Sequence, residues 1–161
     1  MRYNLIIVAL IGAAGLMGCQ SRGGPPMQIQ LCLSLREGDA NELKRVFQEI
    51  ARAEKMDYFD GSAETQRQLE QIDESFDIRK SFPLINIAVR RRDGLGVGGG
   101  NAGLPADQVA FGFTSGRDRK ETKQFAERVI YRLARTWEVE RIPEGQGAFP
   151  LDRCNDQRAA R

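Results

Sequence analysis

Met27-Gln28-Ile29-Gln30-Leu31-Cys32-Leu33-Ser34-Leu35 is the stretch of sequence that decides the fold. Its apolar side chains fall at every second position, and polar side chains or a cysteine stand between them. Because the side chains of a β-strand point alternately to the two faces of a sheet, this period of two residues predicts a strand that is buried on one face only. Such strands are typical of a sheet that is covered on one side.

Two amphipathic helices are predicted to cover this sheet. The first begins at Gly38-Asp39, where Asp39 is the expected cap and Glu42 the acidic half of a capping box. The second is expected to be capped by Ser115, with Asp118 in its third position. Both helices carry apolar stripes of helical spacing, which consist of Leu43, Val46, Phe47, Ile50 and Ala51 in the first helix and of Thr122, Phe125, Ala126, Val129, Ile130, Leu133 and Trp137 in the second.

The remaining strands are predicted at residues 83–91, 109–114 and 138–142. Residues 55–82 form an insert after the first helix, in which 57–62 are expected to be a turn-rich crossing and a short helix to begin at Gly61 or Ser62. The resulting order β-α-insert-β-β-α-β predicts an α+β fold, a two-layer sandwich with ferredoxin-like topology. We expect residues 27–161 to form one such domain with a C-terminal tail.

The N-terminus resembles the signal peptide of bacterial lipoproteins. A positive charge at Arg2 precedes an apolar run, and Leu16-Met17-Gly18-Cys19 resembles the lipobox, whose cysteine is lipidated. The resemblance implies that residues 1–18 are the signal peptide, that Cys19 carries the acyl chains of a membrane anchor, and that residues 19–26 are a flexible tether. An ordinary secretory signal and an uncleaved anchor are the alternatives, although the apolar run is shorter than the roughly 20 residues of a membrane-spanning helix.

The residue after the lipidated cysteine bears on the location. It is Gln20 and not the aspartate that commonly retains lipoproteins at the inner membrane, so the resemblance implies the periplasmic face of the outer membrane, with the inner membrane as the alternative. Residues 20–26 span at most about 25 Å, which keeps the domain close to the membrane. Removal of the signal peptide takes Arg2 from the 24 basic side chains and leaves the 22 acidic ones, and this near-neutral balance gives no reason to expect nucleic-acid binding.

Cys32 and Cys154 are the two cysteines that remain once Cys19 is lipidated. An even number of cysteines in the oxidising periplasm predicts a disulfide between them. Cys32 belongs to the polar set of its strand and is expected on the sheet face away from the helices. A tail that returns across this face after Pro143 would place Cys154 over Cys32, whereas two free thiols are the alternative.

A run of arginines beside a glycine-rich segment is the candidate interaction site. Arginine side chains bind phosphate or carboxylate with two donors, and glycines let backbone N–H groups approach an anion. The segment 93–105 joins two predicted strands and lacks the Gly-Lys-Ser/Thr of a phosphate loop, which argues against nucleotide binding. Two interpretations remain, a disordered connection or a mobile hairpin that contacts lipid headgroups, peptidoglycan or a protein through Arg90, Arg91, Arg92, Gly98, Gly99 and Gly100.

Catalysis is not expected, because the chain contains no histidine. This removes the Ser-His and Cys-His nucleophile pairs and most zinc sites. The insert is acidic but lacks the ligand spacing of a calcium loop, which favours a solvated acidic surface; its carboxylates are Asp57, Asp60, Glu64, Glu70, Asp73, Glu74 and Asp77.

We therefore expect a lipid-anchored periplasmic protein that binds another protein or the envelope, without catalysis and without a cofactor or metal. Two specific forms of this function stay open. One is an immunity lipoprotein that inhibits a delivered toxin, and the other is an accessory to the assembly of an envelope complex. A hydrolase that uses the carboxylates of the insert is the less favoured alternative.

Overall fold

The computed structural model describes residues 27–72, 83–102, 104–105 and 107–142. Within these residues, helices and strands follow one another as β1 (Met27–Ser34), α1 (Asp39–Glu54), β2 (Asp57–Asp60), α2 (Ser62–Ile72), β3 (Asn86–Arg90), β4 (Gly96–Gly100), β5 (Gln108–Thr114), α3 (Arg119–Leu133) and β6 (Val139–Ile142). The predicted α+β class is confirmed.

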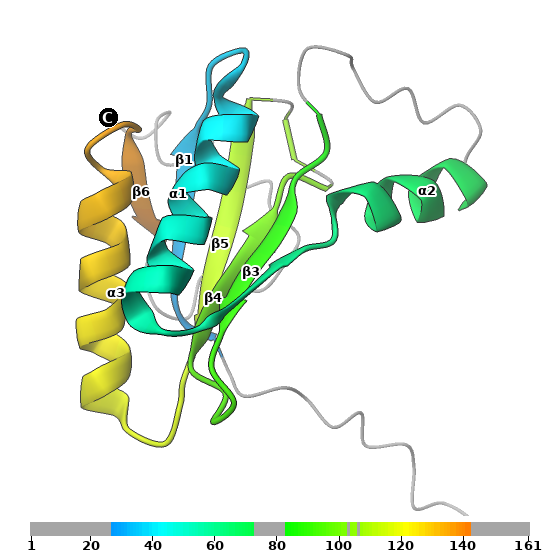
Figure 1. Cartoon of the computed structure of the whole chain (residues 1–161). Helices are drawn as coiled ribbons and strands as arrows, with labels where there is room; N and C mark the ends of the chain where they lie inside the picture. Colours follow the sequence, from blue (N-terminus) through cyan, green and yellow to red (C-terminus); the bar gives the residue numbers. More distant parts are fainter. Residues whose placement is uncertain (1–26, 73–82, 103, 106, 143–161) are drawn as a thin grey trace, which may run out of the picture.

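One antiparallel sheet contains the strands in the order β2-β3-β4-β5-β1-β6. Helices α1 and α3 lie side by side over one face of it, whereas α2 projects from the β3 side of the sheet (Figure 1). The two covering helices and the sheet form the two layers that the apolar patterns predict. The other face of the sheet, which α1 and α3 do not cover, is called the outer face below.

The core lies between the sheet and helices α1 and α3. Three apolar residues of the opening stretch are buried there, namely Leu31, Leu33 and Leu35, and Ile29 is partly buried against the core. Both predicted helical stripes are buried as well. Aromatic rings connect the layers: the ring centroids of Phe47 and Phe111 are 4.6 Å apart, and those of Phe113 and Phe125 are 5.9 Å apart in an edge-on arrangement.

The caps of both helices differ from the prediction. Helix α1 has Gly38 as its N-cap, with φ of 88° and without a capping side chain. The Asp39 carboxylate instead accepts hydrogen bonds from the backbone N–H of Arg36 at 2.8 Å and from the indole N–H of Trp137 at 2.9 Å. Helix α3 begins three residues later than expected, because Asp118, and not Ser115, caps it by accepting from the N–H of Lys120 at 2.7 Å.

Two strands occupy segments that were expected to be irregular. Residues 57–60 form β2, which pairs with β3, and residues 96–100 form β4, which lies between β3 and β5. The expectation of a turn-rich crossing and of a glycine-rich loop was therefore wrong for these residues. The strands expected to be neighbours at the other edge, β6 and β1, do pair. The insertion of β4 makes β3 antiparallel to β1, which a four-stranded ferredoxin-like sheet would not have.

Candidate interaction surfaces

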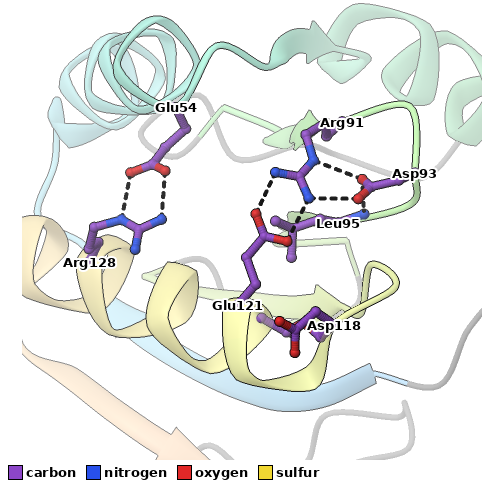
Figure 2. A network of polar contacts seen from close by, with 8 residues as sticks. Glu54, Arg91, Asp93, Leu95, Asp118, Glu121 and Arg128 are labelled. Atoms are coloured by element: carbon purple, nitrogen blue, oxygen red, sulfur yellow. Dashed lines mark hydrogen bonds and ion pairs between the residues drawn. The ribbon is translucent and has the colours of Figure 1, made fainter.

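Arg91 is the centre of a network that joins the β3–β4 turn to the start of α3 (Figure 2). Its Nε and Nη2 donate to the two carboxylate oxygens of Asp93 at 2.9 and 2.6 Å. Its Nη1 and Nη2 donate to the two carboxylate oxygens of Glu121 at 2.6 and 2.8 Å. One guanidinium thus holds two carboxylates in two-donor geometry, one from its own turn and one from the helix.

The turn itself explains why Asp93 faces Arg91. The N–H of Leu95 donates to the Asp93 carboxylate at 3.2 Å, the N–H of Arg91 donates to the carbonyl of Leu95 at 2.8 Å, and Gly94 adopts a φ of 96° between them. The side chain of Leu95 is buried in the core and so attaches the turn to the body of the domain. The hydrogen bonds from Arg91 lower the pKa of Asp93 to about 2 and also lower the pKa of Glu121.

The three arginines of the run therefore have different surroundings. The donors of Arg91 are directed to Asp93 and Glu121, whereas Arg90 and Arg92 are exposed. Arg90 lies on the outer face opposite Gly96 of β4 and Asp57 of β2. An interaction site built on this run would accordingly use Arg90 and Arg92, with Arg91 fixing the turn that carries them.

The glycines of β4 allow this strand to lie close to the backbones of its neighbours. A Cβ on Gly99 would lie 2.0 Å from the carbonyl oxygen of Ala110, and a Cβ on Gly100 would lie 1.9 Å from that of Ile85. Real Cβ atoms are not found so close to a backbone oxygen, so both positions require glycine. Because β4 is hydrogen-bonded to strands on both sides, the backbone N–H groups of Gly98, Gly99 and Gly100 do not form the open anion cradle of a mobile hairpin.

Small side chains cover the centre of the outer face. Cross-strand neighbours there are Cys32 with Ala110, and Ala88 with Gly98. Cys32 lies on this face, as predicted, and is 4% exposed, with Leu104 and Ile142 packed against it and Ala110. Cys154, its predicted disulfide partner, and Cys19, the predicted lipidation site, lie outside the described residues.

Phe59 is the exposed aromatic of this face. It belongs to the edge strand β2, lies opposite Ala88 and is 53% exposed. Phe59 is not among the candidate residues that the sequence predicts. The signal that could have identified it is the alternation of a strand, because its neighbour Tyr58 packs against the core. The exposed apolar ring and the flat surface of Ala88 and Gly98 together form an apolar margin beside the outer edge of β2, which pairs with no other strand among the described residues.

The acidic side chains of the insert are dispersed. Asp60 accepts from the N–H of Ser62 at 3.0 Å and forms an ion pair with Lys44 at 2.9 Å; burial raises its pKa, but these contacts outweigh the burial and lower it overall. On α2, Glu64 and Glu70 accept hydrogen bonds from the side chains of Gln68 and Gln66. In the part of the chain that the structure describes, no three acidic, cysteine or histidine side chains are grouped as metal ligands would be. Asp73, Glu74 and Asp77 lie outside that part.

No known protein family matches the chain, and no curated protein matches it. Among the described residues, no helix is long and apolar enough to cross a membrane.

Proposed function

We propose that this chain is a lipid-anchored protein of the bacterial envelope, attached through Cys19, that acts by binding a protein partner. The resemblance of Leu16-Met17-Gly18-Cys19 to a lipobox carries the proposal. Its support from the fold is the start of β1 at Met27, eight residues after Cys19. Eight residues span at most about 29 Å, so the folded domain would lie beside the membrane, at the periplasmic face of the outer membrane.

The edge of β2 is the surface that best suits a protein partner. An edge strand offers unpaired backbone N–H and C=O groups to an extended segment of another chain. Phe59 provides an exposed aromatic anchor on the same strand, beside the flat surface of Ala88 and Gly98. We propose that the partner adds a strand to β2 and covers Phe59, which fits an inhibitor or an assembly accessory without a catalytic group.

Acyl labelling in cells tests the anchor. Cells that express the chain receive an alkyne-bearing fatty acid, and the purified protein is examined for the label. We expect labelling of the native chain and of Cys154→Ser, and its loss in Cys19→Ser together with release from the membrane fraction. Label that persists in Cys19→Ser would show that Cys19 is not the anchor.

Site-specific photo-cross-linking tests the binding surface. A photoreactive residue replaces Phe59 in one variant and Tyr131 in the matched control, since Tyr131 is 72% exposed on α3. We expect one discrete adduct with a second protein from position 59 and none from position 131. The absence of an adduct from position 59, or equal adducts from both positions, would contradict a partner at β2.

We further propose that Cys32 is joined to Cys154 by a disulfide. The nearly complete burial of Cys32 on the outer face supports this pairing, and so does the end of β6 at Ile142, which pairs with Gln30 two residues from Cys32. Thiol titration of the denatured, non-reduced protein should find neither Cys32 nor Cys154 reactive. Because the sulfur of a lipidated Cys19 is blocked, two reactive thiols per chain would disprove the bridge.

In terms of topology, we interpret the domain as an elaboration of the ferredoxin-like arrangement. Two features fit that arrangement. Helix α1 follows β1, and α3 connects β5 to β6. In the sheet, β1 lies between β5 and β6 and pairs with both. Strand β2, which is parallel to β1, would then be the second strand of that arrangement, and β3 and β4 would be a hairpin added between β2 and β5.

A further inference from the structure

The end of the sheet at which β1 begins is the end at which the chain arrives from Cys19. Cross-strand pairing places five residues in one row there, namely Met27, Thr114, Gly96, Arg90 and Asp57. The turn after β3 and the loop after β5 follow this row directly, and both lie at the lower end of the sheet in Figure 1. We call these two segments, residues 90–95 and 115–121, the basic end.

The charge of the basic end is unbalanced. Its two segments contain six basic and three acidic side chains. Each acid already has a partner, since Asp93 and Glu121 are held by Arg91 and Asp118 caps α3. The remaining basic side chains are exposed, and none of them has an ion pair in the described part of the chain; they are Arg90, Arg92, Arg117, Arg119 and Lys120.

The opposite end of the sheet has the reverse balance. It consists of residues 35–39 and 134–138 with Asn101 and Asp107, and we call it the distal end. Its basic side chains are Arg36 and Arg135, and its acidic ones are Glu37, Asp39, Asp107 and Glu138. Of these two ends, the one that the tether would bring to the membrane therefore has the excess of positive charge, and it keeps this excess when the exposed Asp57 opposite Arg90 is counted with it.

We propose that the basic end lies on the membrane that holds the anchor and binds the phosphate groups of anionic phospholipids. The proposal rests on the lipid anchor at Cys19 for its orientation. Exposed arginines bind phosphate with two donors, and a basic patch next to an acyl anchor is a common second signal for membrane attachment. In this orientation the strands stand on the bilayer, so that the outer face and the edge of β2 remain open to a partner.

Arg91 has a supporting part in this surface. By pairing with Asp93 and Glu121, it neutralises two carboxylates that would otherwise oppose the positive charge of the exposed arginines. It also joins the turn after β3 to the start of α3 through Glu121 (Figure 2). The exposed arginines are thus preorganised on one end of the domain.

Vesicle sedimentation tests the proposal without the acyl chains. The processed chain, residues 19–161 with Cys19→Ser, is mixed with phosphatidylcholine vesicles with and without phosphatidylglycerol. We expect binding only to the anionic vesicles, and its loss at high salt, because surface electrostatics are screened within about 10 Å at 0.1 M salt. Equal binding to both kinds of vesicle, or binding to neither, would overturn the proposal.

A pair of triple variants distinguishes the patch from net charge alone. Arg92→Gln, Arg117→Gln and Arg119→Gln remove three charges from the basic end, and the matched control removes three exposed charges elsewhere through Arg36→Gln, Arg67→Gln and Arg135→Gln. Each basic group near an anionic surface strengthens binding about fivefold, so the first variant should bind about a hundredfold more weakly and the control only a few fold more weakly. Equal losses would overturn the proposal. Because the chain used here carries no lipid, its result is independent of the acyl labelling that tests the anchor.

Discussion

The two ends of the sheet are held by different kinds of bond. At the distal end the side chain of Asn101, which is neutral and buried, accepts from the N–H of Ile85 at 2.7 Å and donates to the carbonyl of Pro83 at 3.2 Å. A charged group takes part there as well, since Asp39 forms an ion pair with Arg36 at 3.7 Å. The indole of Trp137 donates to Asp39 there, and so closes the end of α3 onto the start of α1. At the basic end, Arg91 connects the β3–β4 turn to α3 through its ion pairs with Asp93 and Glu121, and all three side chains are partly exposed.

This difference has a consequence for how each end responds to solution conditions. A buried neutral hydrogen bond is insensitive to salt, and its loss leaves a polar backbone group without a partner in the interior. An exposed ion pair is screened by salt and contributes less, but it can be arranged so that acids are held inward and bases outward. The distal end is therefore expected to fix the fold, and the basic end to set the charge of one surface.

The largest effect is expected from Gly100→Ala at the distal end of β4. The new Cβ would lie 1.9 Å from the carbonyl oxygen of Ile85, so strands β3 and β4 would have to separate. Overpacking of this kind costs about 3 kcal/mol or more, which urea unfolding would measure. Gly98→Ala is the matched control, since its Cβ would lie 3.0 Å from the Cβ of Ala88 and no closer than 3.5 Å to a backbone atom. Equal losses of stability in both variants would show that the close approach at Gly100 is not the cause.

Asn101→Ala is expected to have the next largest effect. It leaves the N–H of Ile85 without its acceptor beside a buried side chain, at a cost of about 2 kcal/mol. Urea unfolding at low and high salt should give the same loss, because no net charge is involved. A loss of stability that becomes smaller at high salt would show that the contact of Asn101 with Ile85 does not act as a neutral hydrogen bond.

Arg91→Gln breaks the network at the basic end and should cost less. Its side chain is 34% exposed, and exposed ion pairs contribute up to about 1 kcal/mol. Unlike the loss in Asn101→Ala, this one should decrease as salt rises. Arg128→Gln offers a comparison, since Arg128 pairs with Glu54 between α3 and α1 at 2.7 Å and is similarly exposed. A salt-independent loss in Arg91→Gln would indicate that the side chain acts by packing.

The sequence predicts the layers of this fold better than its strand count. The alternation in residues 27–35, 85–89 and 109–113, together with the two helical stripes, identifies most of the core, because burial on one face leaves a periodic pattern. Strand β4 shows no such pattern, because Val97 is its one residue with a side chain larger than that of glycine. Strand β2 shows none because it is only four residues long and exposes Phe59 to solvent. These two strands are therefore identified by their pairing with neighbouring strands and not by a pattern of side chains.

The candidate site shows a similar division. The arginine run and the glycines stand out in the sequence. Arg91, however, donates to Glu121, which is 30 positions away on α3. Its role follows from where the α3 start meets the β3–β4 turn, which is a tertiary arrangement. Asp93 had a local signal, since an acidic residue before Gly94 in a turn commonly accepts backbone hydrogen bonds.

Protonation of Asp93 is expected to have the smallest effect, and it sharpens the comparison because the carboxylate at the distal end is held differently. Burial raises the pKa of Asp39, but hydrogen bonds from the backbone N–H of Arg36 and from the indole of Trp137, together with the charge of Arg36, outweigh the burial and lower that pKa overall. Hydrogen bonds from Arg91 lower the pKa of Asp93 to about 2 in the folded chain, from an ordinary value of 3.8. A lowered pKa means that the contribution of Asp93 is fully present above about pH 4 and is lost as the pH falls toward 2. NMR titration of the Asp93 carboxyl should show the low pKa in the native chain and its return toward 3.8 in Arg91→Gln. A pKa near 3.8 in the native chain would mean that Arg91 does not hold Asp93 in solution, and that the carboxylate is free to oppose the positive charge of the basic end.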